Sequence, residues 1–354
     1  MHQQQNLVSV IIPVYCVPKE YIEICVKSFL VQTFSNIEII LVDDGTPDDG
    51  GEMCDALAER YENCISIHQE NRGVSAARNK GLDNASGNWI MFADPDDYVE
   101  KNIVEMLLQN CDAETDIVCC CCKVLLDDKK ENNSFFAGDR TYRTLVEKKE
   151  LFMQLLQADY HQPQKAYTAI GVPWGKLYRK EFLERHHLRF DLDLRRMQDN
   201  LFNMYVFHAA RWIRYIDRPL YIYRYAHLQG YQEDYNPRNL DINMYIIQKR
   251  KQCLEDTNLI QDSELYRAYL MEAFTKMKVI FRFGPLHMKY PESWNQQKKE
   301  ASRIRTLPKI EMLMGELKRT SVLTEATDKV IYTLIDHKQW KLLQWLWSIK
   351  QHME

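Results

Sequence analysis

The sequence has no marked excess of charge and no long apolar run, and each shortage argues against a class of protein. Its 354 residues carry a formal net charge of -4, which gives no reason to expect a nucleic acid as partner. No stretch approaches the ~20 apolar residues of a membrane-spanning helix. The start, "MHQQQNLVSVIIPVY", lacks the basic segment of a secretory signal. We therefore expect a cytoplasmic protein whose membrane contact, if any, is peripheral.

The ten cysteines are scattered or contiguous, a pattern that suits a reducing compartment better than a disulfide framework. Four of them are adjacent, Cys119 to Cys122, inside the apolar run 116–126. Side chains alternate between the faces of a strand, so at most two of these thiols could reach one metal ion. We favour a core strand over a metal or redox site.

Apolar runs and amphipathic stretches alternate over the first 110 residues. The expected strands are 7–14, 37–43, 64–69 and 88–94, which are rich in Val and Ile and nearly continuous in apolarity. The expected helices between them are 18–32, 50–63 and 75–85. This order predicts an α/β fold with a Rossmann-like, doubly wound, mostly parallel sheet.

The rest of the chain has a weaker pattern. The polar stretch 127–143 is expected to form a loop or hairpin, 147–157 a helix, and 172–186 and 197–210 amphipathic segments. Alternating Tyr and Ile predict two strands at 211–217 and 219–227. From about residue 237 the pattern is helical, so we predict regions 1–110, 111–236 and a helical C-terminal extension, 237–354.

Acidic residues stand where two of the predicted strands end. Asp43 and Asp44 follow the second strand, and Asp94, Asp96 and Asp97 follow the fourth. Parallel strands would bring both groups to one rim, where a divalent metal could neutralise them. No glycine-rich phosphate loop follows any strand. Taken alone, the triplet is equally compatible with an ordinary turn and helix N-cap.

Several motifs in fixed order carry a family resemblance. They are "VSVIIPVY", "SFLVQTFSNIEIILVDDGTPD", "NRGVSAARNKGLDNASGNWIMFADPDDY", "VPWGKLYRKEFL" and "QDNLFN". Together they resemble family 2 glycosyltransferases of the GT-A fold, closely over 7–110 and more sparsely over 170–225. The resemblance implies that 1–110 is the nucleotide-sugar-binding half of a GT-A domain and 111–236 its acceptor-side half.

The resemblance also assigns residues of the donor site. The family's D-x-D motif corresponds to Asp94 and Asp96, with Asp96 as the ligand of Mn²⁺ or Mg²⁺ and Asp94 toward the ribose or the sugar. Asn71, Arg72, Arg78 and Asn79 fall in a family segment near the diphosphate and the base, and Arg78 is the strongest candidate. The residues expected to bind the nucleotide-sugar are Pro13, Tyr15, Asp44, Arg78 and Asp94.

Asp199 in "MQDNLFN" matches the position of the family's catalytic acid. A carboxylate there could remove the proton of an acceptor hydroxyl as the new bond forms. The family usually has Glu-Asp where this chain has Gln198-Asp199, which leaves open what orients the base. The alternative is an N-cap for the helix that follows.

The resemblance implies an enzyme that moves a sugar from a nucleotide-diphospho-sugar, commonly UDP-linked, to an acceptor hydroxyl with inversion. The acceptor would be a saccharide or a lipid-linked saccharide, in the synthesis of a cell-surface polysaccharide or glycoconjugate at the inner face of the membrane. Trp174 and Lys176 are candidates for the acceptor side, although aromatic clusters are more often core. Two alternatives stay open: a degenerate, sugar-nucleotide-binding scaffold subunit, and a sugar-nucleotide nucleotidyltransferase.

The C-terminal segment "DHKQWKLLQWLWSIKQH" combines Trp and Leu with basic residues. Such a helix could lie on a membrane. Packing against the catalytic domain or against a second subunit, which would make a homo-oligomer, is the interpretation that we favour.

Overall fold

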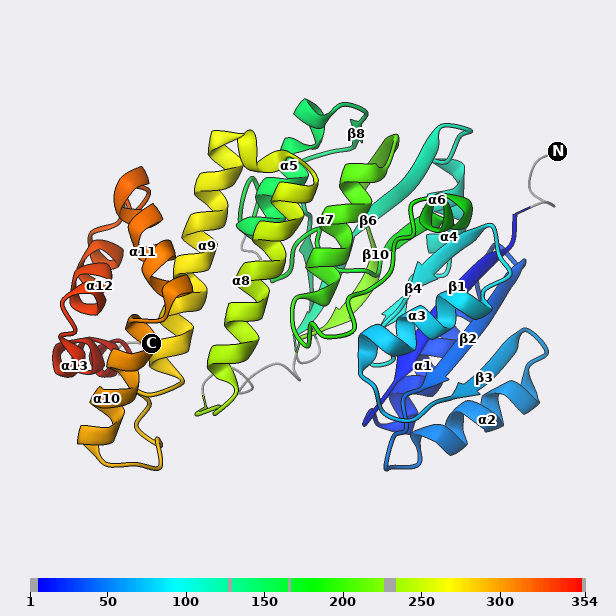
Figure 1. The fold of residues 1–354 in the computed structure, drawn as a ribbon. Helices are drawn as coiled ribbons and strands as arrows, with labels where there is room; N and C mark the ends of the chain where they lie inside the picture. Colours follow the sequence, from blue (N-terminus) through cyan, green and yellow to red (C-terminus); the bar gives the residue numbers. More distant parts are fainter. Residues whose placement is uncertain (1–5, 127–128, 165–166, 226–233, 352–354) are drawn as a thin grey trace. The chain divides into compact units, whose positions relative to one another are not determined.

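The computed structural model describes residues 6–126, 129–164, 167–225 and 234–351. The chain separates into two compact units, Met1–His227 and Leu228–Glu354, which we describe one at a time. The first unit is built on a mixed sheet and the second is helical (Figure 1). The predicted α/β class and the helical C-terminal extension are therefore confirmed.

Strands and helices alternate in the first part of the first unit, as predicted (Figure 1). Four parallel strands lie in the order β3-β2-β1-β4. The strands are β1 (Val8–Val14), β2 (Ile37–Asp43), β3 (Cys64–His68) and β4 (Trp89–Phe92). The helices between them are α1 (Lys19–Leu30), α2 (Gly50–Arg60) and α3 (Val74–Asn84). All seven residues of β1 are buried, as expected of a strand covered on both faces.

The register of these strands brings their carboxyl ends together. Val14 at the end of β1 pairs with Asp43 at the end of β2, and Asp43 pairs with His68 at the end of β3. Ile11 pairs with Phe92, the last residue of β4. The acidic residues that follow β2 and β4 therefore belong to one rim of the sheet.

The other half of the sheet mixes parallel and antiparallel pairs. Here β9 joins β4 to β6, and β10 pairs in parallel with β6. The strands are β5 (Tyr98–Val99), β6 (Thr115–Leu126), β7 (Lys129–Asn133), β8 (Arg140–Tyr142), β9 (Lys176–Arg179) and β10 (Trp212–Arg224). The helices are α4 (Ile103–Gln109), α5 (Leu145–Leu156), α6 (Lys180–Arg185) and α7 (Gln198–Ala209).

One prediction about this half is wrong. The two strands expected at 211–217 and 219–227 are a single strand, β10, which ends at Arg224; residues 226 and 227 of the expected second strand lie outside the described residues. Its register against β6 shifts between Ile216 and Tyr221, so Pro219 is absorbed by an irregularity. The amphipathic stretch 172–186 contains the short strand β9 followed by α6, because the sheet has a gap between β4 and β6 that this segment fills.

The four adjacent cysteines lie in the middle of β6, and each is fully buried. Burial raises the pKa of Cys119 to about 11 and that of Cys121 to about 12, so these thiols stay protonated at neutral pH. The core-strand prediction is confirmed: the thiols pack as small hydrophobic side chains.

Helix α3 packs closely on β1. A Cβ atom at Gly81 would clash with the side chain of Ile11, so only glycine allows this approach. Three small residues at the start of the helix, Ser75, Ala76 and Ala77, are buried. The backbone of α3 is therefore held close to the sheet, near the strand ends.

The second unit contains α8 (Asn239–Asp256), the 3₁₀ helix η1 (Leu259–Gln261), α9 (Ser263–Arg282), α10 (Trp294–Arg305), α11 (Pro308–Thr320), α12 (Ala326–Asp336) and α13 (Trp340–Gln351). Its core includes Leu270, Phe274 and Met277 from α9. Pro308 starts α11, as expected of proline in a first turn. None of the described helices has both the length and the apolar content needed to cross a bilayer.

Candidate active site

A cavity of about 410 Å³ lies at the carboxyl ends of the parallel strands. It brings together residues from β1, the loop after β2, the start of α3 and the turn after β4. All six residues that the sequence assigned to the nucleotide-sugar and the metal line it: Pro13, Tyr15, Asp44, Arg78, Asp94 and Asp96. Along with them, Val14, Val17, Asn71, Gly73, Val74 and Pro95 complete the wall.

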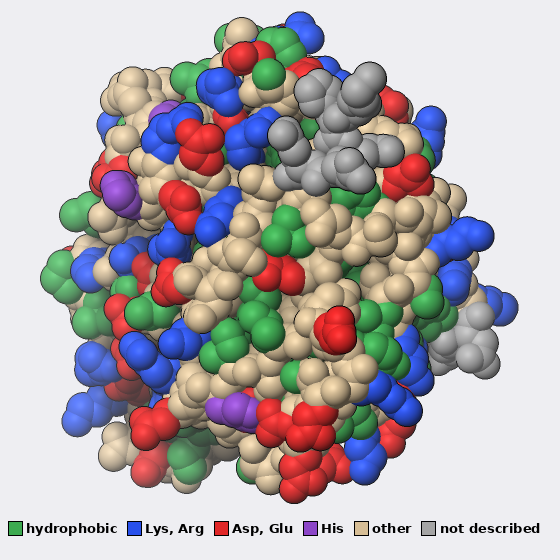
Figure 2. All heavy atoms as spheres, turned by 90° about the vertical axis from the view of Figure 1, so that its right-hand side faces the viewer, with side chains coloured by type: hydrophobic (Ala, Val, Ile, Leu, Met, Phe, Trp, Pro, Cys, Tyr) green, Lys and Arg blue, Asp and Glu red, His purple; other side chains and the backbone are tan. Residues whose placement is uncertain are grey.

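Both signs of charge occur on the surface of the molecule. On the face in Figure 2, a few acidic side chains lie among hydrophobic and uncharged atoms near the centre, and basic side chains lie toward both sides. Acidic side chains also gather at its lower edge. This mixed distribution agrees with the small net charge of -4.

Tyr15 follows β1 and is 47% exposed at the cavity wall. The next residue, Cys16, has a φ of 50°, and its backbone N–H donates to Thr46 Oγ at 2.8 Å. This turn ends β1 and leaves the ring of Tyr15 partly open to solvent. An aromatic face in this position can stack on a planar base.

Asp44 fixes the loop between β3 and α3. Its carboxylate is buried and accepts backbone N–H groups of Arg72 at 2.9 Å and Gly73 at 2.8 Å, and the side-chain amide of Gln69 at 2.7 Å. A carboxylate offers about four acceptor directions, so about one is left for a ligand. Asp44 is both a support of the cavity wall and a candidate acceptor for a base N–H.

Arg78 is 5% exposed and points into the site from α3. Its Nη2 donates to Asp94 Oδ1 at 2.8 Å, and its guanidinium lies over the ring of Phe190 at 5.3 Å. Nε and Nη1 are buried without a hydrogen-bond acceptor in the structure. Buried charged donors normally have partners, so this arrangement favours an anionic ligand.

The turn after β4 is anchored by Asp97, which is 1% exposed. Asp97 accepts hydrogen bonds from the Tyr221 hydroxyl at 2.9 Å and the Arg224 backbone N–H at 2.8 Å. The same Tyr221 hydroxyl accepts the N–H of Asp94 at 3.1 Å. The helix-cap interpretation of Asp97 is wrong, because α4 begins only at Ile103. Asp97 instead ties the turn to β10.

The two carboxylates of the turn after β4, those of Asp94 and Asp96, suit a metal ion that is held partly by the protein and partly by a bound ligand. Among the described residues, no group of three or more His, Cys, Asp and Glu side chains is arranged as a metal site. Asp94 and Asp96 both line the cavity and are partly exposed, and one oxygen of Asp94 already accepts from Arg78. Mg²⁺ is typically bound by one or two carboxylates together with substrate phosphates and water. Two carboxylates beside a phosphate-sized space match that pattern.

Asp199 is the second residue of α7 and is half-buried. Desolvation raises its pKa, the positive charge of Arg78 opposes that rise, and the negative charge of Asp94 adds to it. Arg78 and Asp94 both line the cavity, and both act electrostatically on the Asp199 carboxylate. Its side chain does not cap α7: Met197 holds the N-cap position, with a φ of 62°, so the N-cap alternative is wrong. Gln198 Oε1 is buried without a hydrogen-bond donor.

The two acceptor-side candidates are buried. Trp174 is 1% exposed and stacks on the ring of Tyr221 with centroids 4.2 Å apart. Lys176 is fully buried, and its Nζ donates to the backbone carbonyl of Val172 at 2.6 Å. Burial lowers the pKa of Lys176. This burial favours the core interpretation of both side chains over direct contact with an acceptor.

Phe190, whose ring lies against the guanidinium of Arg78, could not be identified from the sequence. The side chain of Asn79 holds Phe190 in place: its Nδ2 donates to the Phe190 carbonyl and its Oδ1 accepts the Phe190 N–H, both at 2.9 Å. The segment around Phe190 has no periodicity, so it could not be assigned to the site. The one feature of the sequence that points to this contact is the Asn directly after Arg78.

Comparisons with known proteins agree with this geometry. A family model described as "Glycosyl transferase family 2" matches residues 9–186. The putative glycosyltransferase EpsH of Bacillus subtilis is 32% identical, with the match covering 72% of this chain and 71% of EpsH. Glycosyltransferase GlyA of Streptococcus pneumoniae is 35% identical over 61% of this chain, and the uncharacterized glycosyltransferase EpsJ of B. subtilis is 39% identical over 62%. The matches span 30% of GlyA and 61% of EpsJ.

A solved structure has the same fold. S. aureus TarS 1-349, in a crystal structure titled as a complex with UDP-GlcNAc, matches with a TM-score of 0.63 and 18% identity, over 96% of this chain and 89% of that one. With the family model covering half of the sequence, and EpsH matched over most of its length, the chain belongs to glycosyl transferase family 2.

Proposed function

We propose that this chain transfers a sugar from a UDP-linked donor to an acceptor hydroxyl with inversion at the anomeric carbon. The observation that carries the proposal is the cavity at the strand ends. It gathers an aromatic ring, a buried carboxylate, an arginine with two unpartnered nitrogens and two further carboxylates. Structures of TarS titled as complexes with UDP and with UDP-GlcNAc support a uridine nucleotide as the ligand.

In this proposal the base lies against Tyr15, and its N–H is accepted by Asp44. The diphosphate takes the unpartnered donors of Arg78. Asp96, with help from Asp94, would hold Mn²⁺ or Mg²⁺, and the ion would neutralise charge on the leaving diphosphate. Arg78 would orient the diphosphate directly, because its guanidinium is fixed between Asp94 and Phe190.

Asp199 would act as the general base. Burial raises the pKa of Asp199, which makes the carboxylate a stronger base than an exposed Asp, and the positive charge of Arg78 opposes that rise. Proton removal by a positioned carboxylate contributes roughly 10²–10⁴-fold to such reactions. One base and one leaving group describe a single displacement, which inverts configuration.

Two alternatives remain distinct from this proposal. A scaffold subunit would bind the sugar-nucleotide without turnover, and Gln198 in place of the family's usual Glu is the feature that favours it. A nucleotidyltransferase would need a glycine-rich loop after β1, and "PVYCVPKEY" contains no glycine.

A thermal-shift screen followed by turnover separates the three. UDP-sugars should raise the melting temperature with Mn²⁺ present, since a ligand that binds the folded state stabilises it. The matching UDP-sugar should then be hydrolysed slowly or transferred to an acceptor, and Asp199→Asn should abolish turnover while keeping the shift. Binding across a wide donor panel without turnover would support the scaffold.

We infer that the acceptor is a saccharide or a lipid-linked saccharide of the cell surface, used at the cytoplasmic face of the membrane. The minor teichoic acid biosynthesis protein GgaB of B. subtilis is 41% identical over 116 residues, which supports a role in building a surface polymer. Extracting lipid-linked saccharides and testing them with the identified donor would check this inference.

A further inference from the structure

Helix α13 has apolar side chains on two opposite sides. Trp340, Leu343 and Trp347 are buried, with exposed fractions of at most 6%. Leu342, Trp345 and Ile349 are spaced at i, i+3 and i+7 and form a second stripe, with exposed fractions of 53%, 61% and 36%. An ordinary surface helix has only one apolar face.

The buried face accounts for the docking of α13 in the second unit. Trp340 Nε1 donates to Ser302 Oγ at 2.9 Å, and its ring stacks on Phe281 with centroids 5.3 Å apart. Gln344 Nε2 donates to the carbonyl of Leu286 at 3.0 Å. These contacts hold α13 within the second unit, and the outer stripe of Leu342, Trp345 and Ile349 takes no part in them. Packing of the helix against the catalytic domain or a second subunit stays a prediction.

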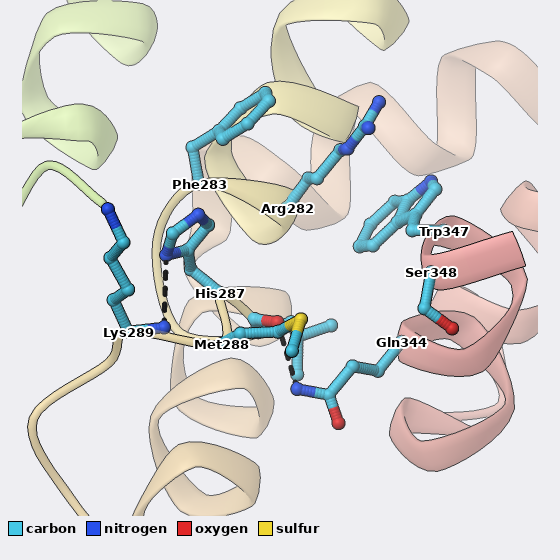
Figure 3. Close-up of a pocket in the computed structure, with 9 residues that line it drawn as sticks. Arg282, Phe283, His287, Met288, Lys289, Gln344, Trp347 and Ser348 are labelled. Carbon is cyan, nitrogen blue, oxygen red and sulfur yellow. Dashed lines mark hydrogen bonds between the residues drawn. The ribbon is translucent and has the colours of Figure 1, made fainter. Parts of the chain in front are cut away.

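The surroundings of the outer stripe are basic. Lys338 and Lys341 are exposed beside it, and the sequence from His337 to Gln351 contains no Asp or Glu. A pocket of about 300 Å³ separates α13 from the turn after α9, which presents Met288 opposite Gln344 (Figure 3). Met288 is 78% exposed.

Two cationic residues, Arg282 and Lys289, line the same pocket (Figure 3). Lys289 pairs with Asp234 at 2.9 Å on the surface, whereas the only interaction found for the Arg282 guanidinium among the described residues is with the Phe283 ring, at 5.2 Å. The second unit thus has an exposed apolar stripe on α13 and, between α13 and the turn after α9, a pocket that two cationic residues line.

We propose that the outer stripe of α13 docks on an anionic lipid membrane, with Leu342, Trp345 and Ile349 entering the headgroup region and the exposed Lys338 and Lys341 facing the lipid charges. Trp is favoured at membrane interfaces, and basic side chains are attracted to anionic lipids. A second copy of the chain fits less well, because a stable interface needs about 20–30 residues a side, whereas the stripe has three apolar side chains bordered by like charges. The inference is independent of the donor chemistry.

Vesicle flotation with the full chain tests the proposal. We expect binding to vesicles of phosphatidylcholine with phosphatidylglycerol, weaker binding to phosphatidylcholine alone, and loss of binding as salt is raised. The double variant Leu342→Gln, Trp345→Gln should lower the partition coefficient by at least roughly tenfold, because two large apolar side chains no longer leave water. Lys338→Glu with Lys341→Glu should remove the preference for the anionic lipid.

The matched control is Met312→Gln with Val330→Gln, which changes two exposed apolar residues of α11 and α12. It should bind as the unmodified chain does, and circular dichroism should show that every variant is folded. Equal binding by the Leu342, Trp345 double variant would overturn the proposal. So would dimerisation that depends on these two residues, or no vesicle binding by the unmodified chain.

Discussion

Arg78 Nη2 donates to Asp94 Oδ1 at 2.8 Å, while Nε and Nη1 of the same guanidinium have no acceptor among the described residues. The ion pair joins α3 to the turn after β4, the next strand of the chain. Because Arg78 is 5% exposed, water cannot readily satisfy the two remaining donors. The site is thus partly neutralised from within and keeps donors aimed at a ligand.

Replacing Arg78 with Ala should weaken UDP binding. Hydrogen bonds to charged groups contribute on the order of 1.5–3 kcal/mol, so we expect a rise in Kd of roughly ten- to a hundredfold by titration calorimetry. Arg78→Lys should recover only part of the loss, because an ammonium lacks the planar fork. Arg60→Ala is the matched control, since that arginine is exposed at the end of α2 and does not line the cavity. An unchanged Kd for Arg78→Ala would exclude the proposed role.

The neighbours Asp96 and Asp97 should behave differently. Asp96→Asn should remove the extra thermal shift that Mn²⁺ gives with UDP, and leave the stability of the ligand-free protein within about 0.5 kcal/mol. Asp97→Ala should lower that stability by about 1–3 kcal/mol, because Tyr221 and the Arg224 N–H lose their buried acceptor. Urea unfolding without ligand measures both. If Asp96→Asn destabilised the protein as much as Asp97→Ala, the division of roles would be wrong.

Asp199→Asn should lower kcat by about 10²–10⁴-fold with little change in donor binding. The raised pKa of Asp199 should place the acidic limb of the pH–rate profile above the ordinary Asp value of about 3.9. A group whose pKa is raised by folding binds its proton more tightly in the folded state, so its contribution to stability falls as pH rises. The Asn variant should therefore gain most in stability, relative to the unmodified protein, at alkaline pH. Retained turnover would identify another base.

Site residues that follow a predicted strand could be placed from the sequence, whereas residues held by long-range contacts could not. Asp44, Asp94 and Asp96 follow apolar runs, and parallel strands bring their ends to one rim, so their grouping could be predicted from order alone. The contact of Asn79 with Phe190 joins residues 111 positions apart and has no periodic signal. The burial of Lys176 could not be predicted for a related reason: a lysine in a short amphipathic segment is normally exposed, and its burial depends on where β9 enters the sheet.

His68 links β3 to β2 and α2, and it should make stability depend on pH. Its Nδ1 lies 2.9 Å from Asp43 Oδ2 and its Nε2 lies 2.8 Å from Asp55 Oδ1, and these partners raise the pKa of the imidazole. A raised folded pKa gives stabilisation that is complete below the unfolded value of about 6.5 and is lost as pH rises through the folded pKa.

His68→Gln should therefore reduce the urea midpoint at mildly acidic pH and have little effect at alkaline pH. The effect should be small, because the side chain is 48% exposed. His186→Gln, at an exposed position of the same unit, serves as the control. A loss of stability that is the same at both pH values would mean that the protonated imidazole makes no special contribution.

The close approach of α3 to β1 at Gly81 has a consequence for how this protein can be altered. Gly81 lies one turn after Arg78 on the same helix, and it is not among the residues that line the cavity. A single added methyl group there would push the helix off Ile11 and carry the guanidinium away from Asp94. Activity could thus be lost through a buried position that a map of ligand contacts would omit, so screens of this enzyme for altered donor use should hold residue 81 fixed.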